Sequence, residues 1–231
     1  GAVVTREDGF GADAPLVVVD DTLAALEALG RVGRERIGNA VIAVTGSVGK
    51  TGTKETLRAV LGAQAPTQAS EKSYNNKWGV PLSLSRTPRD TAYGVFEIGM
   101  NKAGEIAGLS PQVRPDVAII THVSSAHLEF FDSVEAIADA KAEIFEGMAE
   151  GGFAVLNEDT PHFERLADAA RRRGIAVHGF GESAGPWARL VAYRARESAG
   201  TVVADIGGKE VRYDIGAAGK HWAMNSVAVL A

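Results

Sequence analysis

A lysine and a threonine directly follow a glycine-containing turn, and residue types in this order are suited to holding a phosphate. The turn lies between an apolar run at 40–46 and a helix-compatible run at 50–62, and it consists of Thr45, Gly46, Ser47, Val48, Gly49, Lys50 and Thr51. Backbone N–H groups of such a turn can face an anion, the lysine can reach the outer phosphates of a nucleotide, and the threonine hydroxyl can ligate Mg²⁺. The usual spacing would place the first glycine at residue 44, so this loop is a shortened form. A turn that binds nothing is the weaker alternative, because strand, turn, Lys-Thr pair and helix follow one another as phosphate binding requires.

Two further polar residues come directly after predicted strands. Glu97 ends the run at 93–99, and His127 follows the run at 115–121. Ligands of parallel sheets bind beyond the carboxyl ends of the strands, so Glu97 is a candidate for holding Mg²⁺ against the phosphates of a nucleotide. A solvated or ion-paired glutamate, and a packed or surface histidine, are the alternatives.

Lys141 interrupts the apolar side of a predicted helix at 132–147. It lies four residues after Ile137 and seven after Val134, in the middle of the apolar stripe of that helix. One reading is a lysine with a buried stem and its amine in water. The other is a buried amine with a depressed pKa, which reacts with CO₂ when neutral and becomes a carbamate able to ligate a metal. From the residues alone the first reading is preferred.

The elements around these residues predict an α/β protein. Apolar runs at 14–21, 40–46, 93–99, 115–121, 151–157 and 175–180 predict strands, and helices are predicted at 22–38, 50–62, 132–147 and 160–174. Leu23, Leu26, Leu29 and Val32 lie on one side of the first helix, and Asp132 is the expected cap of the third. The alternation predicts a parallel sheet flanked by helices. Turn signals at 187–217 predict a small antiparallel sheet, and a last helix begins near residue 219.

Composition excludes several classes of protein. The 231 residues carry a net charge of −5, and the basic residues are scattered apart from a run at 171–173, which argues against a nucleic-acid partner. Apolar runs are too short for a transmembrane helix, and the first residues do not resemble a signal peptide. The absence of cysteine excludes disulfides, thiolate metal sites and a cysteine nucleophile. We expect a cytoplasmic monomer without membrane insertion.

The chain resembles the Mur ligase family from about residue 14 to its end, because six sequence motifs of that family occur in it in the same order. They lie at 45–57, 73–84, 96–106, 114–147, 154–160 and 219–231. The strings at 75–81 and 97–106 favour the branch that adds D-alanyl-D-alanine to UDP-MurNAc-tripeptide in peptidoglycan precursor synthesis. The resemblance implies that ATP phosphorylates the tripeptide carboxylate and that the dipeptide amine attacks the acyl phosphate.

The resemblance also assigns roles to individual residues. It implies that Lys50 and the loop amides hold the outer phosphates, that Thr51 and Glu97 ligate one Mg²⁺, and that His127 and a carbamoylated Lys141 serve a second. It reverses the preference stated above for Lys141. Asn225 matches an adenine-contacting asparagine. Asn75 and Asn76 match a pair near the nucleotide and the peptide substrate, with an asparagine turn as the alternative, and the roles of Asn101 and Glu105 stay open.

The chain departs from the family pattern at two motifs and at both ends. His122 stands where an asparagine is common, and His221-Trp222 replaces His-Asn, so that Trp222 is expected to widen or cover the adenine face. Residues 1–20 resemble the tail of an N-terminal UDP-substrate domain, and 21–231 resemble a central ATP-binding domain. We expect the isolated chain to be inactive or weakly active as a ligase.

Three other functions remain as alternatives. One is a related ligase with another acceptor, either another Mur-type enzyme or a folylpolyglutamate-type enzyme. The second is a nucleotide-binding subunit that does not ligate, which the intact set of candidate residues argues against. A P-loop GTPase is a poor third, because the loop spacing differs and no guanine-reading motif is found.

Overall fold

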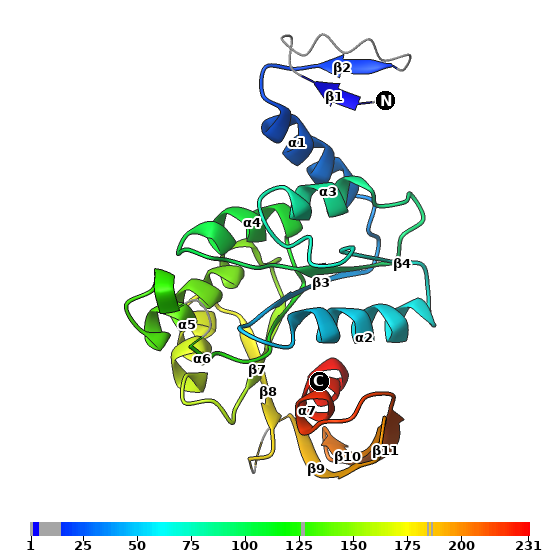
Figure 1. The fold of residues 1–231 in the computed structure, drawn as a ribbon, viewed down its shortest axis with the longest axis vertical. Coiled ribbons are helices and arrows are strands. Elements are labelled where there is room, and N and C mark those ends of the chain that lie inside the picture. The colour runs from blue at the N-terminus through cyan, green and yellow to red at the C-terminus, as the bar shows by residue number, and fades with distance from the viewer. Residues whose placement is uncertain (1, 5–14, 126–127, 184, 186) are drawn as a thin grey trace.

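The computed structural model describes residues 2–4, 15–125, 128–183, 185 and 187–231, and its centre is a nine-stranded sheet (Figure 1). The strand order is β11-β10-β9-β8-β7-β6-β3-β5-β4, and every pair from β4 to β9 is parallel. The strands of the parallel part are β3 (Ala40–Thr45), β4 (Thr67–Ala69), β5 (Tyr93–Glu97), β6 (Val117–Ile120), β7 (Phe153–Asn157) and β8 (Ala176–Gly181). The predicted α/β class with a parallel sheet is confirmed.

Helices cover both faces of this sheet, because the side chains of each strand alternate between two cores. Val41 and Ala43 of β3 belong to one core, and Ile42 and Val44 belong to the other. The first core packs against α3 (Gly79–Ser85), α4 (Glu105–Val113), α5 (Val134–Ala142) and α6 (Phe163–Arg171). The second packs against α2 (Lys50–Gly62) and α7 (Lys220–Leu230), which lie on the opposite side in Figure 1.

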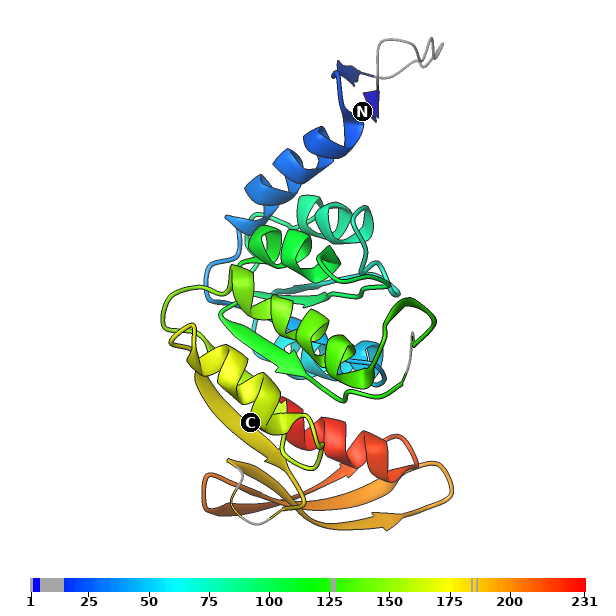
Figure 2. The same ribbon diagram turned by 90° about the vertical axis from the view of Figure 1, so that its left-hand side faces the viewer.

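The chain begins at one end of the molecule, apart from the main sheet (Figure 2). Strands β1 (Ala2–Val4) and β2 (Leu16–Val18) form a separate parallel pair, and α1 (Thr22–Arg34) leads from it to the main sheet. The side of α1 that carries Leu29 and Val32 is exposed, at 47% and 52% for these two residues. The face that packs on α3 instead contains buried glycines at Gly30 and Gly33. An added Cβ at Gly33 would lie 1.9 Å from the Leu84 carbonyl oxygen, so glycine allows the close approach.

At the opposite end the sheet becomes antiparallel. Strands β9 (Ala188–Ala195), β10 (Gly200–Ile206) and β11 (Lys209–Ile215) form the expected antiparallel sheet, although β9 also pairs with β8. The three strands are therefore an extension of the main sheet rather than a separate body. Helix α7 packs between these strands and α2.

Local details correct the prediction for residues 132–147. The cap of α5 is Ser133, whose hydroxyl accepts from the Ala136 N–H at 3.1 Å, and not Asp132. The α-helix ends at Ala142 and continues as a 3₁₀ helix, Glu143–Gly147; another short 3₁₀ helix is Leu128–Phe130. Within the described ranges, no helix combines the length and apolarity needed to cross a membrane.

Candidate functional site

The loop at 45–51 turns sharply from β3 into α2, and β3 lies between β6 and β5 in the parallel part of the sheet. Gly46 and Gly49 have φ angles of +146° and +88°, which residues with a Cβ rarely adopt. Gly49 occupies the cap position of α2, and no side chain caps this helix. The first N–H groups of α2 lack intrahelical partners and point out of the helix end, where they are suited to bind an anion.

The segment after β6 holds this loop in place. The Ser47 N–H donates to the His122 carbonyl at 2.7 Å, and the Ser47 hydroxyl accepts from the Ser124 N–H at 3.0 Å. The Thr121 hydroxyl donates to the Val48 carbonyl at 2.6 Å. These bonds use the N–H and hydroxyl of Ser47 and the carbonyl of Val48, and none uses an N–H at the start of α2. The loop is therefore fixed while the N–H groups at the start of α2 stay available to an anion.

Lys50 folds back over the loop. Its ammonium donates to the Gly46 carbonyl at 2.7 Å. Burial lowers the pKa of Lys50, and the nearby Glu97 carboxylate opposes this shift. The structure therefore brings together a cation, a helix N-terminus and an acidic residue at the carboxyl ends of the neighbouring strands β3 and β5.

Glu97 is almost fully buried at the end of β5, with an exposed fraction of 1%. One carboxylate oxygen accepts from the Thr51 hydroxyl at 2.8 Å, and the other accepts from the Asn75 amide at 2.7 Å. The two bonds fix the plane of the carboxylate. The sequence predicted Thr51 and Glu97 as a pair, and the structure places them in direct contact.

Lys141 lies inside the protein, with 2% of the residue exposed. This burial contradicts the reading in which its amine reaches water. Burial, with a smaller contribution from the charge of Lys50, lowers the pKa of Lys141 to about 7. A sizeable fraction of the amine is therefore neutral at neutral pH. His127, the other residue predicted for this region, lies outside the described residues.

The start of α7 closes the other side of the loop. The amide of Asn225 lies so close to Gly49 that an added Cβ there would be 2.6 Å from its nitrogen. The indole of Trp222 lies against Gly52 in the same way, at 2.3 Å. The start of α7 and the loop at 45–51 border a hollow of about 550 Å³, which is lined by residues 47–52, Ser73, Asn75, Glu97, His221, Trp222 and Asn225.

Three other predicted residues lie away from this hollow. The Asn76 side-chain carbonyl accepts from the Trp78 and Gly79 N–H groups at 3.1 and 2.9 Å, which matches the asparagine-turn alternative. Glu105 accepts from the Asn101 N–H at 2.6 Å, at the start of α4. Asn76, Asn101 and Glu105 line a different hollow of about 470 Å³.

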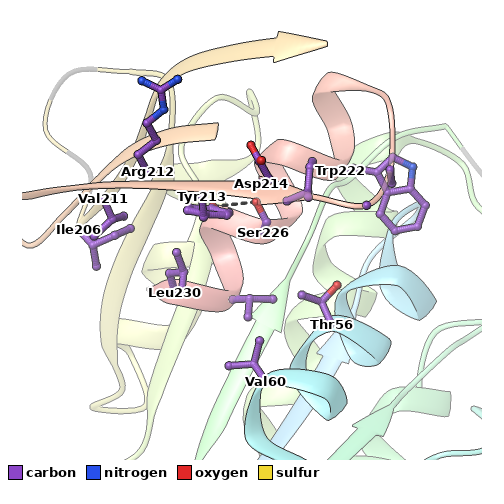
Figure 3. Close-up of a pocket in the computed structure, with 14 residues that line it drawn as sticks. Thr56, Val60, Ile206, Val211, Arg212, Tyr213, Asp214, Trp222, Ser226 and Leu230 are labelled. Atoms are coloured by element: carbon purple, nitrogen blue, oxygen red, sulfur yellow. Dashed lines mark hydrogen bonds between the residues drawn. The ribbon is translucent and has the colours of Figure 1, made fainter. Parts of the chain in front are cut away.

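A larger cavity of about 710 Å³ lies beside the loop, between α2, α7 and β11 (Figure 3). Its walls are mostly apolar, and a hydrogen bond of 2.8 Å joins the Tyr213 and Ser226 hydroxyls within it. It shares Trp222 with the loop hollow but contains none of the phosphate-loop residues. The smaller hollow is the better candidate site, because it holds the charged and hydrogen-bonding groups described above.

Sequence reasoning missed Lys54 on α2. Lys54 is 0% exposed, and its ammonium donates to backbone carbonyls of the segment that leads to Asn75. The signal was available in the sequence: Lys54 falls three residues before Leu57 and seven before Leu61, on the apolar line of its helix. The same reasoning singled out Lys141.

Comparison with known proteins agrees with the geometry. The family model for the Mur ligase middle domain matches residues 44–231. A UDP-N-acetylmuramoyl-tripeptide–D-alanyl-D-alanine ligase of Rickettsia prowazekii is 32% identical over 99% of this chain, which spans 51% of that protein. The crystal structure of MurF from Acinetobacter baumannii superposes with a TM-score of 0.86 at 31% identity, covering 99% of this chain and 49% of that one. MurF from Thermotoga maritima in complex with ADP gives 0.82 at 28% identity, with coverages of 96% and 51%.

Proposed function

This chain belongs to the Mur ligase family, and from that premise we propose that it is the ATP-binding region of a ligase that joins D-alanyl-D-alanine to UDP-MurNAc-tripeptide. The observation that carries the proposal is the shortened phosphate loop with Lys50 on it and the Thr51–Glu97 pair beside it. The names of the relatives at 32% and 31% identity support this choice of substrates. The work of such a ligase is the synthesis of peptidoglycan precursors in the cytoplasm.

The proposed reaction has two steps. An oxygen of the terminal carboxylate attacks the γ-phosphorus of ATP, and the bond to the β-phosphate oxygen breaks to release ADP. The amine of D-alanyl-D-alanine then attacks the acyl carbon, and phosphate leaves with the former carboxylate oxygen. Because a carboxylate and a triphosphate are both anions, the site must supply positive charge. Lys50 and the N–H groups at the start of α2 supply it in this chain.

The residues present suit Mg²⁺, which prefers oxygen ligands and is commonly held by one or two carboxylates together with substrate phosphates. Thr51 and Glu97 would hold one ion, and His127 and a carbamoylated Lys141 would serve the second. Among the described residues, no group of three or more histidines and carboxylates could hold a metal alone, so phosphate oxygens would complete the first site. When bound, the ions neutralise the charge that develops on the phosphates.

Burial of Lys141 supports its proposed modification. A pKa of about 7 leaves a neutral amine available. Its nitrogen lone pair attacks the carbon of CO₂, a C–N bond forms, and one proton is released, which leaves a carbamate anion. The modification replaces a buried cation beside Lys50 with a carboxylate.

The start of α7 forms the side of the hollow that is proposed to bind the adenine base. Asn225 lies against Gly49 and Trp222 against Gly52, so both border the hollow that would contain the nucleoside. We assign Asn225 to the adenine and Trp222 to the face that covers it. Asn75 is assigned to the nucleotide end of the substrate site through its bond to Glu97, and Asn76 to the peptide side.

The proposed boundaries follow the same premise. We propose that residues 21–231 form the central ATP-binding domain and that residues 1–20 are the end of a UDP-substrate domain; the family match at 44–231 supports the first assignment for that part of the chain. We propose that the protein acts as a monomer. Because the chain spans about half the length of its relatives, we expect the chain alone to bind ATP but to ligate slowly or not at all.

The test is ADP release by the chain extended to the length of its relatives. UDP-MurNAc-tripeptide is supplied with and without D-alanyl-D-alanine. In parallel reactions, other amino acids and dipeptides take the place of D-alanyl-D-alanine. Release that requires D-alanyl-D-alanine supports the proposal. Release with another acceptor identifies a related ligase, and ATP binding without release under any condition identifies a non-ligating nucleotide-binding subunit.

A further inference from the structure

We propose that Lys54 is a positioning residue, which fixes the segment at 70–75 so that Asn75 orients the Glu97 carboxylate toward Thr51. The inference rests on the proposed function, because the Mg²⁺-binding role of Glu97 belongs to it. Lys54 itself lies outside the hollow of the phosphate loop. It therefore acts through other residues and does not touch the nucleotide.

The ammonium of Lys54 is completely buried and completely partnered. It donates to the Ser70 carbonyl at 2.7 Å and to the Lys72 carbonyl at 2.8 Å, and it lies 2.7 Å from a carboxylate oxygen of Glu55. An ammonium has three N–H donors, so these three acceptors satisfy it. Burial of a charge is costly unless it is paired and hydrogen-bonded, and these three partners offset that cost at a position where an apolar residue would otherwise be expected.

The two carbonyls belong to the segment that surrounds Glu97. Ser70 follows β4, and its hydroxyl accepts from the Glu97 N–H at 3.3 Å. Lys72 has a φ angle of +47°, a conformation that a non-glycine residue holds only when its surroundings impose it. The bond from Lys54 to the carbonyl of Lys72 is a contact able to impose this turn.

The turn delivers Asn75 to the carboxylate. Asn75 accepts from the Gly99 N–H at 2.8 Å through its carbonyl and donates to Glu97 at 2.7 Å through its side chain. With one oxygen of Glu97 held by Asn75, the other is left facing Thr51 at 2.8 Å. A chain of hydrogen bonds and the backbone between them thus join Lys54 to the pair proposed to hold Mg²⁺.

The test measures how much Mg²⁺ strengthens ATP binding to the 231-residue chain. The ratio of the ATP dissociation constants in EDTA and in saturating Mg²⁺ is determined for the wild type and for Lys54→Met, Asn75→Ala and the double variant. We expect Lys54→Met to reduce this ratio roughly tenfold, a usual cost of losing an outer-shell partner of a metal ligand, with binding in EDTA unchanged. In the Asn75→Ala background the added effect should fall below about twofold, because the two residues act in one chain of contacts.

Two controls separate the possible outcomes. Glu55→Gln removes the ion pair of Lys54 but keeps both carbonyl bonds, so it should leave the ratio unchanged. Lys54→Arg keeps the charge and should retain most of the ratio. If Lys54→Met does not fold, Lys54→Gln, which also removes the charge, carries the test with the same expected loss. The inference would be overturned if Lys54→Met weakened ATP binding equally in EDTA and in Mg²⁺. It would also be overturned if the reductions of the ratio caused by Lys54→Met and Asn75→Ala multiplied in full in the double variant. If Glu97→Gln keeps the wild-type ratio, the proposed Mg²⁺ site fails whatever Lys54 does.

Discussion

The hydroxyl of Thr51 donates a 2.8 Å hydrogen bond to Glu97, which joins the first turn of α2 to the end of β5. These residues are far apart in sequence and follow β3 and β5, two neighbouring parallel strands of the sheet. Both side chains carry oxygen atoms, which Mg²⁺ prefers as ligands, and both line the same hollow as Lys50. The contact therefore places the two residues proposed to ligate Mg²⁺ beside the residue proposed to hold the phosphates.

Removing either partner of this contact should reduce the effect of Mg²⁺ on ATP binding. We expect Thr51→Val and Glu97→Gln each to weaken ATP binding in Mg²⁺ about tenfold or more, because a ligand of a hard cation is lost. Binding in EDTA should change little in Thr51→Val. Calorimetric titration of the chain with ATP measures both conditions, and Glu164→Gln on the exposed face of α6 is the matched control. An unchanged affinity in Mg²⁺ for both variants would contradict the assignment.

Stability should depend on pH through Lys141. Its pKa is about 7 in the folded chain and near 10.5 when unfolded, so the unfolded state binds more protons between these values. Stability from this residue therefore rises as pH increases from 7 to 10.5, and the full destabilisation is present below pH 7. Lys141→Met should stabilise the chain more at pH 6 than at pH 9, by roughly 2–3 kcal/mol of unfolding free energy.

Urea unfolding at the two pH values, in buffer free of CO₂, measures this difference. Lys209→Met, on an exposed residue of β11, provides the control and should show no such dependence. An equal effect of Lys141→Met at both pH values would show that the amine is not held uncharged by burial.

Trp222 should contribute to the binding of the adenine base and not to the binding of the phosphates. It borders the loop hollow beside Asn225, and stacking of a base on an aromatic ring is worth about 1–3 kcal/mol. We expect Trp222→Ala to weaken ATP binding about tenfold while inorganic triphosphate binds as before, and Trp222→Phe to retain most of the affinity. Lys50→Ala should weaken both ligands. Competition against a fluorescent ATP analogue makes the comparison, and equal losses for ATP and triphosphate in Trp222→Ala would contradict the base-binding role.

The packing of α1 on α3 should not tolerate a methyl group at Gly33. An added Cβ would meet the Leu84 carbonyl at 1.9 Å, so Gly33→Ala must displace backbone and should cost about 1–3 kcal/mol. Gly108→Ala in α4 is the matched control, because nothing lies within 4 Å of its Cβ position. That substitution should instead stabilise by roughly 0.5–1 kcal/mol through helix propensity. Thermal unfolding of both variants decides whether the glycine-mediated contact is as close as described.

The sequence predicted the elements whose patterns come from burial alone. The strands at 40–46 and 93–99 are continuous apolar runs because both of their faces are covered, and the helix at 50–62 matches α2. The phosphate loop and its partner Glu97 followed, since ligands of parallel sheets bind at the carboxyl ends of strands. The apolar pattern of single elements and the general rule on ligand sites of parallel sheets were therefore enough to predict these features.

Features that depend on tertiary contacts escaped prediction. Helices α3 and α4 carry Pro81 and Pro111, which obscure a helical pattern, and β4 has only three residues. On α1 the leucine side looked like the packing face, but Gly33 allows a closer contact than a leucine would. The position of Lys54 on the apolar line of α2 could have been noticed in the sequence, but its partners, the carbonyls of Ser70 and Lys72, are set by tertiary contacts that the sequence does not reveal.

The most direct test of the central claim follows one oxygen atom through the reaction. The chain, extended to the length of its relatives, is supplied with ATP, D-alanyl-D-alanine and UDP-MurNAc-tripeptide whose terminal carboxylate carries ¹⁸O at both oxygens, and the released phosphate is analysed by mass spectrometry. If the loop holds the γ-phosphate for attack by that carboxylate, each phosphate released should contain one ¹⁸O atom. Phosphate without ¹⁸O, released at the rate of ADP formation, would contradict the account, because water and not the carboxylate would then have attacked the γ-phosphorus.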